Sequence, residues 1–259
     1  MARFNIFLIL LFFSKPIFAQ DFSLYQKKDF RQAGETLPYR ILYPLNYDST
    51  KKYPLILFLH GSGERGIDNE KQLSHGGNLF LKDSIRMNFP SFVVFPQCPE
   101  SSFWSNVIIK KDSIGTRKFT FLTGGEPNRS LVLTEALIQK LLYTLPVYKR
   151  KVYVMGLSMG GMGTFEIVGR NPHLFAAAIP ICGGANPETA KILKKTKWWI
   201  FHGAKDDTVS PEFSIQMAEA LKKEKANVKF TLYPEEKHDS WDKAFSEPSL
   251  LPWLFDQHR

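Results

Sequence analysis

Cysteine is scarce in this chain, whose 259 residues include only two, Cys98 and Cys182. Two thiols cannot build the multi-bridge scaffold of a small secreted domain, and they lack the spacing of a zinc site. Each follows a predicted strand, which favours two small buried thiols over a bridge, although an exported protein would permit a bridge. No glycine-rich loop carries the lysine of a phosphate-binding loop. The sequence therefore predicts no metal ion and no cofactor.

Long apolar runs are also scarce. Residues 4–13 form one that is broken only by Asn5, but it falls well short of the roughly 20 residues that span a bilayer. Arg3 precedes this run and Ala19 follows it, so residues 1–19 are predicted to be a signal peptide cleaved after Ala19. Cleavage after Gln20 and an uncleaved membrane anchor are the alternatives. The mature chain, residues 20–259, is then expected in the periplasm or the medium, without an integral membrane anchor.

The positive charge does not take the pattern that binds nucleic acid. The formal net charge is +9, but lysines and arginines are scattered in small groups with no basic stripe interleaved with aromatics. A solvated basic surface is expected, and attraction to an acidic polysaccharide stays open, as does the oligomeric state. Internal repeats and low-complexity tracts are missing, and 44% hydrophobic residues suffice for one sizeable core.

Short apolar runs alternate with longer amphipathic ones, which predicts a single α/β domain with a mostly parallel sheet and helices on both faces. Strands are predicted at residues 39–43, 54–59, 92–95, 152–155, 176–181, 198–201 and 228–233, and helices at 131–145, 160–170, 211–223 and 250–257. The stretch 99–129 shows no periodicity. It is predicted to be an irregular insertion that shapes a substrate pocket, because long loops are often functional.

Ser158 stands in the sequence Gly156-Leu157-Ser158-Met159-Gly160, between a predicted strand and a predicted helix. A sharp turn at this point strains the serine backbone and brings neighbouring chains close, so glycine is needed two residues to either side. The turn would present the serine hydroxyl beside the positive end of the following helix, where backbone N–H groups can hold an oxyanion. The pattern predicts a nucleophilic serine.

A serine hydroxyl needs a base, and in this setting an acid and then a histidine follow it in the sequence. His238 lies in a loop after the last predicted strand, from which it can reach back to Ser158, and is the predicted base. Asp206 follows the preceding strand and is the predicted acid, whereas Asp207 is expected to cap the turn or the helix that follows. The other downstream histidines fit less well: His173 and His258 lie away from the site, and His202 is expected to be structural.

The second oxyanion donor is expected from the loop "LHGSGERG" after an early strand. The backbone N–H groups of Ser62 and Met159 are assigned to this role, with Gly61 as the alternative. His60 precedes the nucleophile and is expected to brace the loop by hydrogen bonds. Glu64 and Arg65 are expected to brace it as an ion pair, with substrate binding as the alternative.

Together these motifs resemble the α/β-hydrolase superfamily, and within it the secreted bacterial esterases of the "predicted peptidase" or phospholipase/carboxylesterase-like group. The resemblance covers nearly all of the mature chain. The segments that carry it are "YPLILFLHGSGERGIDN", "PQCPE", "GLSMGGMGTFEI", "FAAAIPICGGA", "FHGAKDDTVSP" and "HDSWDKAF". It implies the α/β-hydrolase fold, with Ser158, Asp206 and His238 as the catalytic residues, an oxyanion loop at Gly61-Ser62 and no cofactor.

The activity expected from the residues is that of an exported serine hydrolase acting on carboxylic esters. Related esterases commonly act on acetyl or feruloyl groups of polysaccharides, and a peptidase of the prolyl-oligopeptidase type is the alternative. Trp104 and Trp241 lie in loops near the motifs and are candidate substrate-binding residues, with a packing role as the other interpretation.

Overall fold

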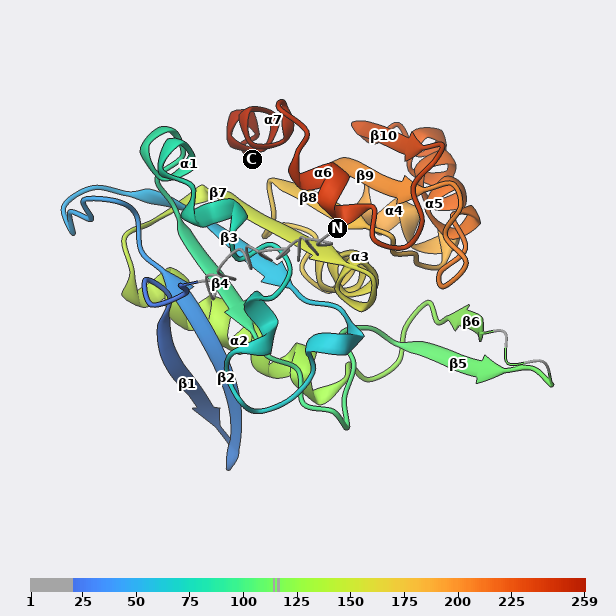
Figure 1. Cartoon of the computed structure of the whole chain (residues 1–259), viewed down its shortest axis with the longest axis horizontal. Helices are drawn as coiled ribbons and strands as arrows, with labels where there is room; N and C mark the ends of the chain where they lie inside the picture. The colour runs from blue at the N-terminus through green and yellow to red at the C-terminus, as the bar shows by residue number, and fades with distance from the viewer. Residues whose placement is uncertain (1–20, 114, 116) are drawn as a thin grey trace, which may run out of the picture.

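The computed structural model describes residues 21–259 except 114 and 116, so the predicted signal peptide lies outside the described residues. An eight-stranded sheet has the order β1-β2-β4-β3-β7-β8-β9-β10 (Figure 1). Its strands are β1 Gln26–Gln32, β2 Glu35–Leu42, β3 Tyr53–Leu59, β4 Phe92–Pro96, β7 Val147–Leu157, β8 Ala177–Ile181, β9 Lys197–Gly203 and β10 Val228–Tyr233. From β4 to β10 every neighbouring pair is parallel, while β1 and β2 form an antiparallel edge. The predicted α/β class and mostly parallel sheet are confirmed.

Helices cover both faces of the sheet. They are α1 Asp83–Asn88, α2 Arg129–Thr144, α3 Met159–Arg170, α4 Ala190–Leu193, α5 Glu212–Lys223, α6 Trp241–Phe245 and α7 Leu250–Asp256. Short 3₁₀ turns are η1 Ser62–Glu64, η2 Lys71–Leu73, η3 Leu79–Leu81 and η4 Pro187–Thr189. Among the described residues, none of these helices is both long and apolar enough to cross a bilayer.

The core forms two layers, one on each side of the sheet. In β3, Leu55 and Leu57 belong to the layer under α2, α3 and α5, whereas Ile56 and Phe58 belong to the layer under α6 and α7. Successive side chains of a strand point to opposite faces, so a strand with helices on both sides must be apolar throughout. This is why the central strands were recognisable in the sequence as unbroken apolar runs.

Strand β1 was missed because it has no apolar pattern. Its sequence QKKDFRQ buries only Phe30. It is held by its antiparallel register with β2 through a tight turn, in which Ala33 and Gly34 both have positive φ, 51° and 78°. Pairing of the backbone, rather than burial of side chains, makes this segment a strand.

The stretch 99–129 is more regular than predicted. It contains an antiparallel hairpin, β5 Val107–Lys111 and β6 Arg117–Phe121, which extends away from the sheet (Figure 1). The aromatic rings of Phe119 and Phe121 pack edge-on against Phe213 of α5, with ring centroids 5.8 and 5.2 Å apart. The prediction of an irregular loop was therefore wrong: the hairpin is polar and exposed at its end, which hides the alternation of a strand, and three aromatic rings anchor its base.

The two cysteines are free and buried, as predicted.

Candidate active site

Ser158 is the single residue between β7 and α3, and its backbone is strained, with φ 53° and ψ −116°. The flanking glycines are needed for close packing. A Cβ on Gly156 would lie 2.2 Å from the carbonyl oxygen of Gly160, and a Cβ on Gly160 would lie 1.9 Å from the carbonyl oxygen of Leu59. Real Cβ atoms do not approach a backbone oxygen so closely. The packing therefore leaves no room for a Cβ at positions 156 and 160, which is the reason the sequence analysis gave for glycine in the G-x-S-x-G motif.

A chain of hydrogen-bonded side chains starts at Ser158. Its Oγ lies 2.9 Å from His238 Nε2, and His238 Nδ1 lies 2.7 Å from Asp206 Oδ2. The serine comes from the β7–α3 turn, the aspartate from the loop after β9 and the histidine from the loop after β10. Because these are carboxyl ends of parallel strands, residues 32 to 80 positions apart in the sequence meet at one edge of the sheet. The structure brings together the three residues selected from the sequence.

Asp206 is held on both oxygens. Its Oδ1 accepts backbone N–H groups of Thr208 and Val209, both at 2.9 Å. Burial would raise the pKa of this carboxyl, but hydrogen bonds from His202, His238 and Val209 outweigh burial and hold the pKa well below its usual range. Asp206 is therefore a carboxylate near neutral pH. The neighbouring Asp207 accepts only the Thr208 hydroxyl, at 3.3 Å, and remains exposed.

The residues assigned to the oxyanion hole lie beside Ser158. Ser62 is the first residue of η1 and Met159 the first of α3, and the first N–H groups of a helix have no acceptor within it. Both residues line the same hollow as Ser158. A Cβ on Gly61 would lie 3.6 Å from that of Ser158, so this part of the loop passes close to the serine. The choice between Ser62 and Gly61 as donor stays a prediction.

The hollow beside Ser158 has a volume of about 280 Å³ and opens to solvent. Four of its lining residues, Phe103, Ile109, Arg117 and Phe119, come from the stretch 99–129, three of them from the β5–β6 hairpin. The insertion supplies much of the wall in which an acyl or alcohol group would lie.

Trp104 does not line this hollow, and its assignment to substrate binding is corrected. Its side chain is fully buried, its Nε1 donates to the carbonyl oxygen of His60 at 3.1 Å, and its Cβ packs against Gly163. Trp104 therefore has the packing role, which the sequence analysis gave as the other interpretation. The neighbouring Phe103 lines the hollow instead.

Trp241 also lies outside the wall of the hollow. Its ring packs edge-on against His238 with centroids 5.3 Å apart, and it tilts against His75 at 5.2 Å. A large, half-buried ring against one side of the imidazole restricts how His238 can move. Its contact is with the candidate base rather than with the space where a substrate would bind.

The expected ion pair between Glu64 and Arg65 is not formed. Glu64 Oε1 lies 3.6 Å from His75 Nε2, whereas Arg65 donates to the carbonyl oxygens of Ser62 at 3.1 Å and Glu100 at 2.9 Å. Arg65 still braces the loop, but by tying its backbone to the segment after β4. Sequence proximity suggested the pair, and the backbone carbonyls offered the arginine a better partner.

Phe103 and Trp104 are expected to separate activity from stability. Trp104→Ala should lower the free energy of unfolding by about 3–5 kcal/mol, because a large buried ring is lost. Phe103→Ala should lower it clearly less, because this ring is only partly buried against the core. It should lower kcat/KM for p-nitrophenyl octanoate about tenfold relative to the acetate, since a longer acyl chain loses an apolar contact. Urea denaturation measures the stability of the two variants, and hydrolysis of the octanoate and acetate esters measures their activity. Equal effects of the two variants on stability would contradict the assignment of Trp104 to the core and Phe103 to the hollow.

His60 braces the loop as predicted. The Cys98 N–H donates to its Nε2 at 3.0 Å, and its Nδ1 donates to the Gly61 carbonyl oxygen at 2.6 Å. Both bonds suit a neutral imidazole protonated on Nδ1. Burial lowers the pKa of His60 to about 4.

This pKa predicts a loss of stability in mild acid. The unfolded chain binds a proton at His60 near the ordinary value of 6.5, and the folded chain does so only near 4. The free energy of unfolding therefore has its full value above pH 6.5. It falls by about 3 kcal/mol in all as the pH drops from 6.5 to 4. Urea denaturation at several pH values should show this slope in the wild type and a flatter one in His60→Gln. Parallel slopes would contradict it.

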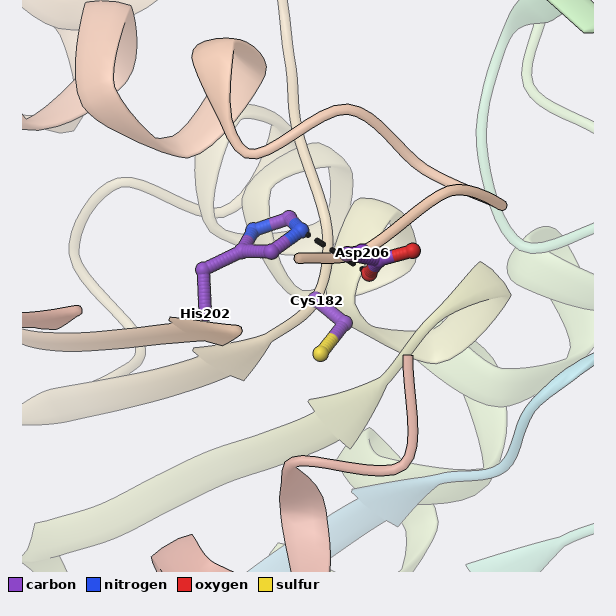
Figure 2. Close-up of side chains that lie close together, drawn as sticks. All are labelled: Cys182, His202 and Asp206. Atoms are coloured by element: carbon purple, nitrogen blue, oxygen red, sulfur yellow. Dashed lines mark hydrogen bonds and ion pairs between the residues drawn. The ribbon is translucent and has the colours of Figure 1, made fainter. Parts of the chain in front are cut away.

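Cys182, His202 and Asp206 form a buried group whose donor atoms lie within 4.8 Å of one another, close enough to consider a metal ion (Figure 2). Their chemistry does not fit one. Cys182 Sγ already has a hydrogen-bond partner in Ser240 Oγ at 2.9 Å, and burial raises the pKa of this thiol to about 12. His202 Nε2 faces two acceptors and therefore carries a proton instead of a free electron pair. The group is better described as a hydrogen-bonded cluster.

The parallel sheet, the strained serine turn and the residues at the carboxyl ends of the strands define an α/β-hydrolase. The chain belongs to the dienelactone hydrolase family, whose model matches residues 105–247. Among curated protein sequences none matches significantly.

Solved structures agree with this fold. A thermostable esterase is 32% identical with a TM-score of 0.81; the match covers 92% of this chain but only 64% of that one. A ferulic acid esterase from Anaeromyces mucronatus, in complex with ferulic acid, is 15% identical with a TM-score of 0.61, covering 90% of each chain. An acylaminoacyl peptidase from Pyrococcus horikoshii is 14% identical with a TM-score of 0.60, covering 90% of this chain and 41% of that one. The last two show a likeness of fold alone.

Proposed function

We propose that this protein is a serine hydrolase that cleaves carboxylic esters through an acyl-enzyme. The observation that carries the proposal is the continuous contact from Ser158 Oγ through His238 to the buried carboxylate of Asp206, beside an open hollow. This arrangement activates a weak nucleophile and orients its base, which is what acyl transfer requires.

In the proposed mechanism Ser158 Oγ attacks the ester carbonyl carbon while His238 Nε2 takes the hydroxyl proton. Asp206 stabilises the resulting imidazolium through His238 Nδ1–H. The backbone N–H groups of Ser62 and Met159 hold the oxyanion of the tetrahedral intermediate. His238 then returns its proton to the leaving alcohol, and the acyl-enzyme forms. Water attacks this acyl-enzyme by the same route in reverse order, which releases the acid and regenerates Ser158.

The proposed substrates are small or polysaccharide-linked esters, with acetyl or feruloyl groups first among those to be tested. The open hollow and its apolar lining residues Phe103, Ile109 and Phe119 suit an acyl or aromatic group. The neighbour solved with ferulic acid gives a reason to test this compound class, although its likeness extends to the fold only. Amide hydrolysis is the second candidate, because the same fold is found in an acylaminoacyl peptidase.

A substrate panel tests the proposal. The mature protein is assayed on p-nitrophenyl acetate, butyrate and octanoate, methyl ferulate, acetylated xylan and aminoacyl anilides. Ester hydrolysis faster than anilide hydrolysis is expected. Faster cleavage of the anilides would replace the esterase assignment with the peptidase one, and no hydrolysis of any substrate would refute both.

Export is a separate proposal carried by residues 1–19, which lie outside the described residues. Expression of the full chain in a bacterium should give a periplasmic or secreted product whose first residue is Gln20, or Asp21 if cleavage follows Gln20. N-terminal sequencing of the fractionated product checks this. A product that keeps Met1 in the cytoplasm would contradict it.

A further inference from the structure

A second histidine contacts the carboxylate that holds His238. His202 is the penultimate residue of β9, its side chain is 0% exposed, and its Nε2 lies 3.1 Å from Asp206 Oδ2. The same nitrogen lies 2.9 Å from the carbonyl oxygen of Val209, and Nδ1 lies 2.7 Å from the hydroxyl of Ser214 on α5. Figure 2 shows the imidazole turned toward Asp206 beside Cys182.

The partners of His202 define where its proton must be. Nε2 faces two acceptors, so it carries a hydrogen in either charge state of the ring. The charge state of the ring changes only the hydrogen bond at Nδ1. A neutral ring accepts the Ser214 hydroxyl hydrogen at Nδ1, whereas an imidazolium donates to Ser214, whose hydroxyl then donates to the Gly183 carbonyl oxygen at 3.0 Å. In both states His202 donates to Asp206.

One carboxylate oxygen, Asp206 Oδ2, therefore accepts hydrogen bonds from two imidazoles, that of His202 at 3.1 Å and that of His238 at 2.7 Å. The other oxygen is held by two backbone N–H groups. With both oxygens bonded twice, the carboxylate cannot rotate without breaking a buried hydrogen bond. The bonded chain of side chains runs from Ser214 through His202, Asp206 and His238 to Ser158.

We infer that His202 is a positioning residue that fixes the Asp206 carboxylate and shares its charge with His238. This inference rests on the proposed function. His202 does not line the hollow, and of its hydrogen bonds the one to Asp206 leads to His238. Removing its hydrogen bond frees Oδ2 to turn away from His238, and a displacement of about 1 Å in a catalytic group lowers the rate about 100-fold.

The shared oxygen also predicts a change in pH dependence. Without His202, Oδ2 turns away from His238 and stabilises its imidazolium less, which favours neutral His238, the form that can act as a base. The titratable groups facing Asp206 are His202 from β9, His238 from the loop before α6, and Cys182 after β8. The thiol stays protonated at these pH values, since burial raises its pKa to about 12.

The test compares His202→Gln, His202→Asn and His202→Leu. Glutamine can present an amide N–H near the position of Nε2, whereas asparagine is too short and leucine has no donor. We expect kcat on p-nitrophenyl acetate to fall about 100-fold in His202→Asn and His202→Leu, with KM within about twofold. The acid limb of kcat/KM should move to lower pH in both, because the displaced carboxylate stabilises the His238 imidazolium less. His202→Gln should restore most of kcat and the pH profile.

Met217→Ala is the matched control, because Met217 is equally buried on α5 but does not contact Asp206. It should lower the thermal midpoint while keeping kcat and the pH profile. If all three His202 variants only lower the midpoint, His202 is structural and the inference is overturned. If His202→Leu does not fold, the Gln and Asn pair decides, and equal activity of these two overturns the inference. Failure of the proposed function would give a different result from failure of this inference, because Ser158→Ala would then keep the esterase activity.

Discussion

Ser158→Ala is expected to lower kcat for p-nitrophenyl acetate by at least about 10⁴-fold. Loss of the nucleophile leaves only the binding and oxyanion contributions, and removing a catalytic serine in comparable hydrolases costs more than this. The fold should remain, because alanine at this position loses one hydroxyl and adds no atom. The measurement is steady-state hydrolysis alongside a thermal unfolding curve.

Ser246→Ala is a suitable control for this variant. Its hydroxyl bonds only to the Asp242 carbonyl oxygen on the exposed side of α6, so wild-type kcat is expected. A fluorophosphonate probe should label the wild type and Ser246→Ala at Ser158 and leave Ser158→Ala unlabelled. Hydrolysis by purified Ser158→Ala at the wild-type rate, with a wild-type unfolding curve, would show that another group is the nucleophile.

Gly160→Ala is expected to have the largest effect on folding. The added Cβ would lie 1.9 Å from the Leu59 carbonyl oxygen and 2.7 Å from that of His60. Both atoms belong to backbone at the end of β3 and the start of the oxyanion loop, so no side-chain rotation relieves the clash. We expect a loss of at least about 4 kcal/mol in stability, or no soluble folded protein.

Gly169→Ala, in the same helix, is the matched control for this effect. Its nearest neighbour would be Leu193 Cδ2 at 3.6 Å, which is an ordinary contact. Helix propensity should make this variant neutral or up to about 1 kcal/mol more stable. Urea denaturation followed by circular dichroism compares the two variants. A wild-type midpoint for Gly160→Ala would show that the turn does not need glycine.

The sequence predicted those features that follow from local chemistry and strand periodicity. Both faces of β3 are buried, so it is apolar throughout and was recognisable without a structure. The G-x-S-x-G turn is largely local as well, because its glycines are required by contacts within the turn and with the end of one neighbouring strand, β3. The order Ser158, Asp206, His238 was also recognisable, since each residue lies in the turn or loop that follows a predicted strand.

The predictions that were wrong or missing concerned residues whose contacts are distant in the sequence. Trp104 and Phe103 are adjacent and both aromatic, and only the tertiary structure decides which one enters the core and which one faces the hollow. Arg65 stands next to Glu64 but bonds to carbonyl oxygens near residue 100. Strand β1 has no apolar alternation and exists because β2 pairs with it.

The sequence alone determined the fold class and the residue types that can perform acyl transfer, because strand burial and the serine turn impose composition directly. The tertiary structure decided how those residues are connected. His202 was assigned a structural role from its position before Gly203, yet it lies on the oxygen of Asp206 that also holds His238. Hydrogen bonds between side chains leave no periodic signature in a sequence, since they depend on where separate strands end in space.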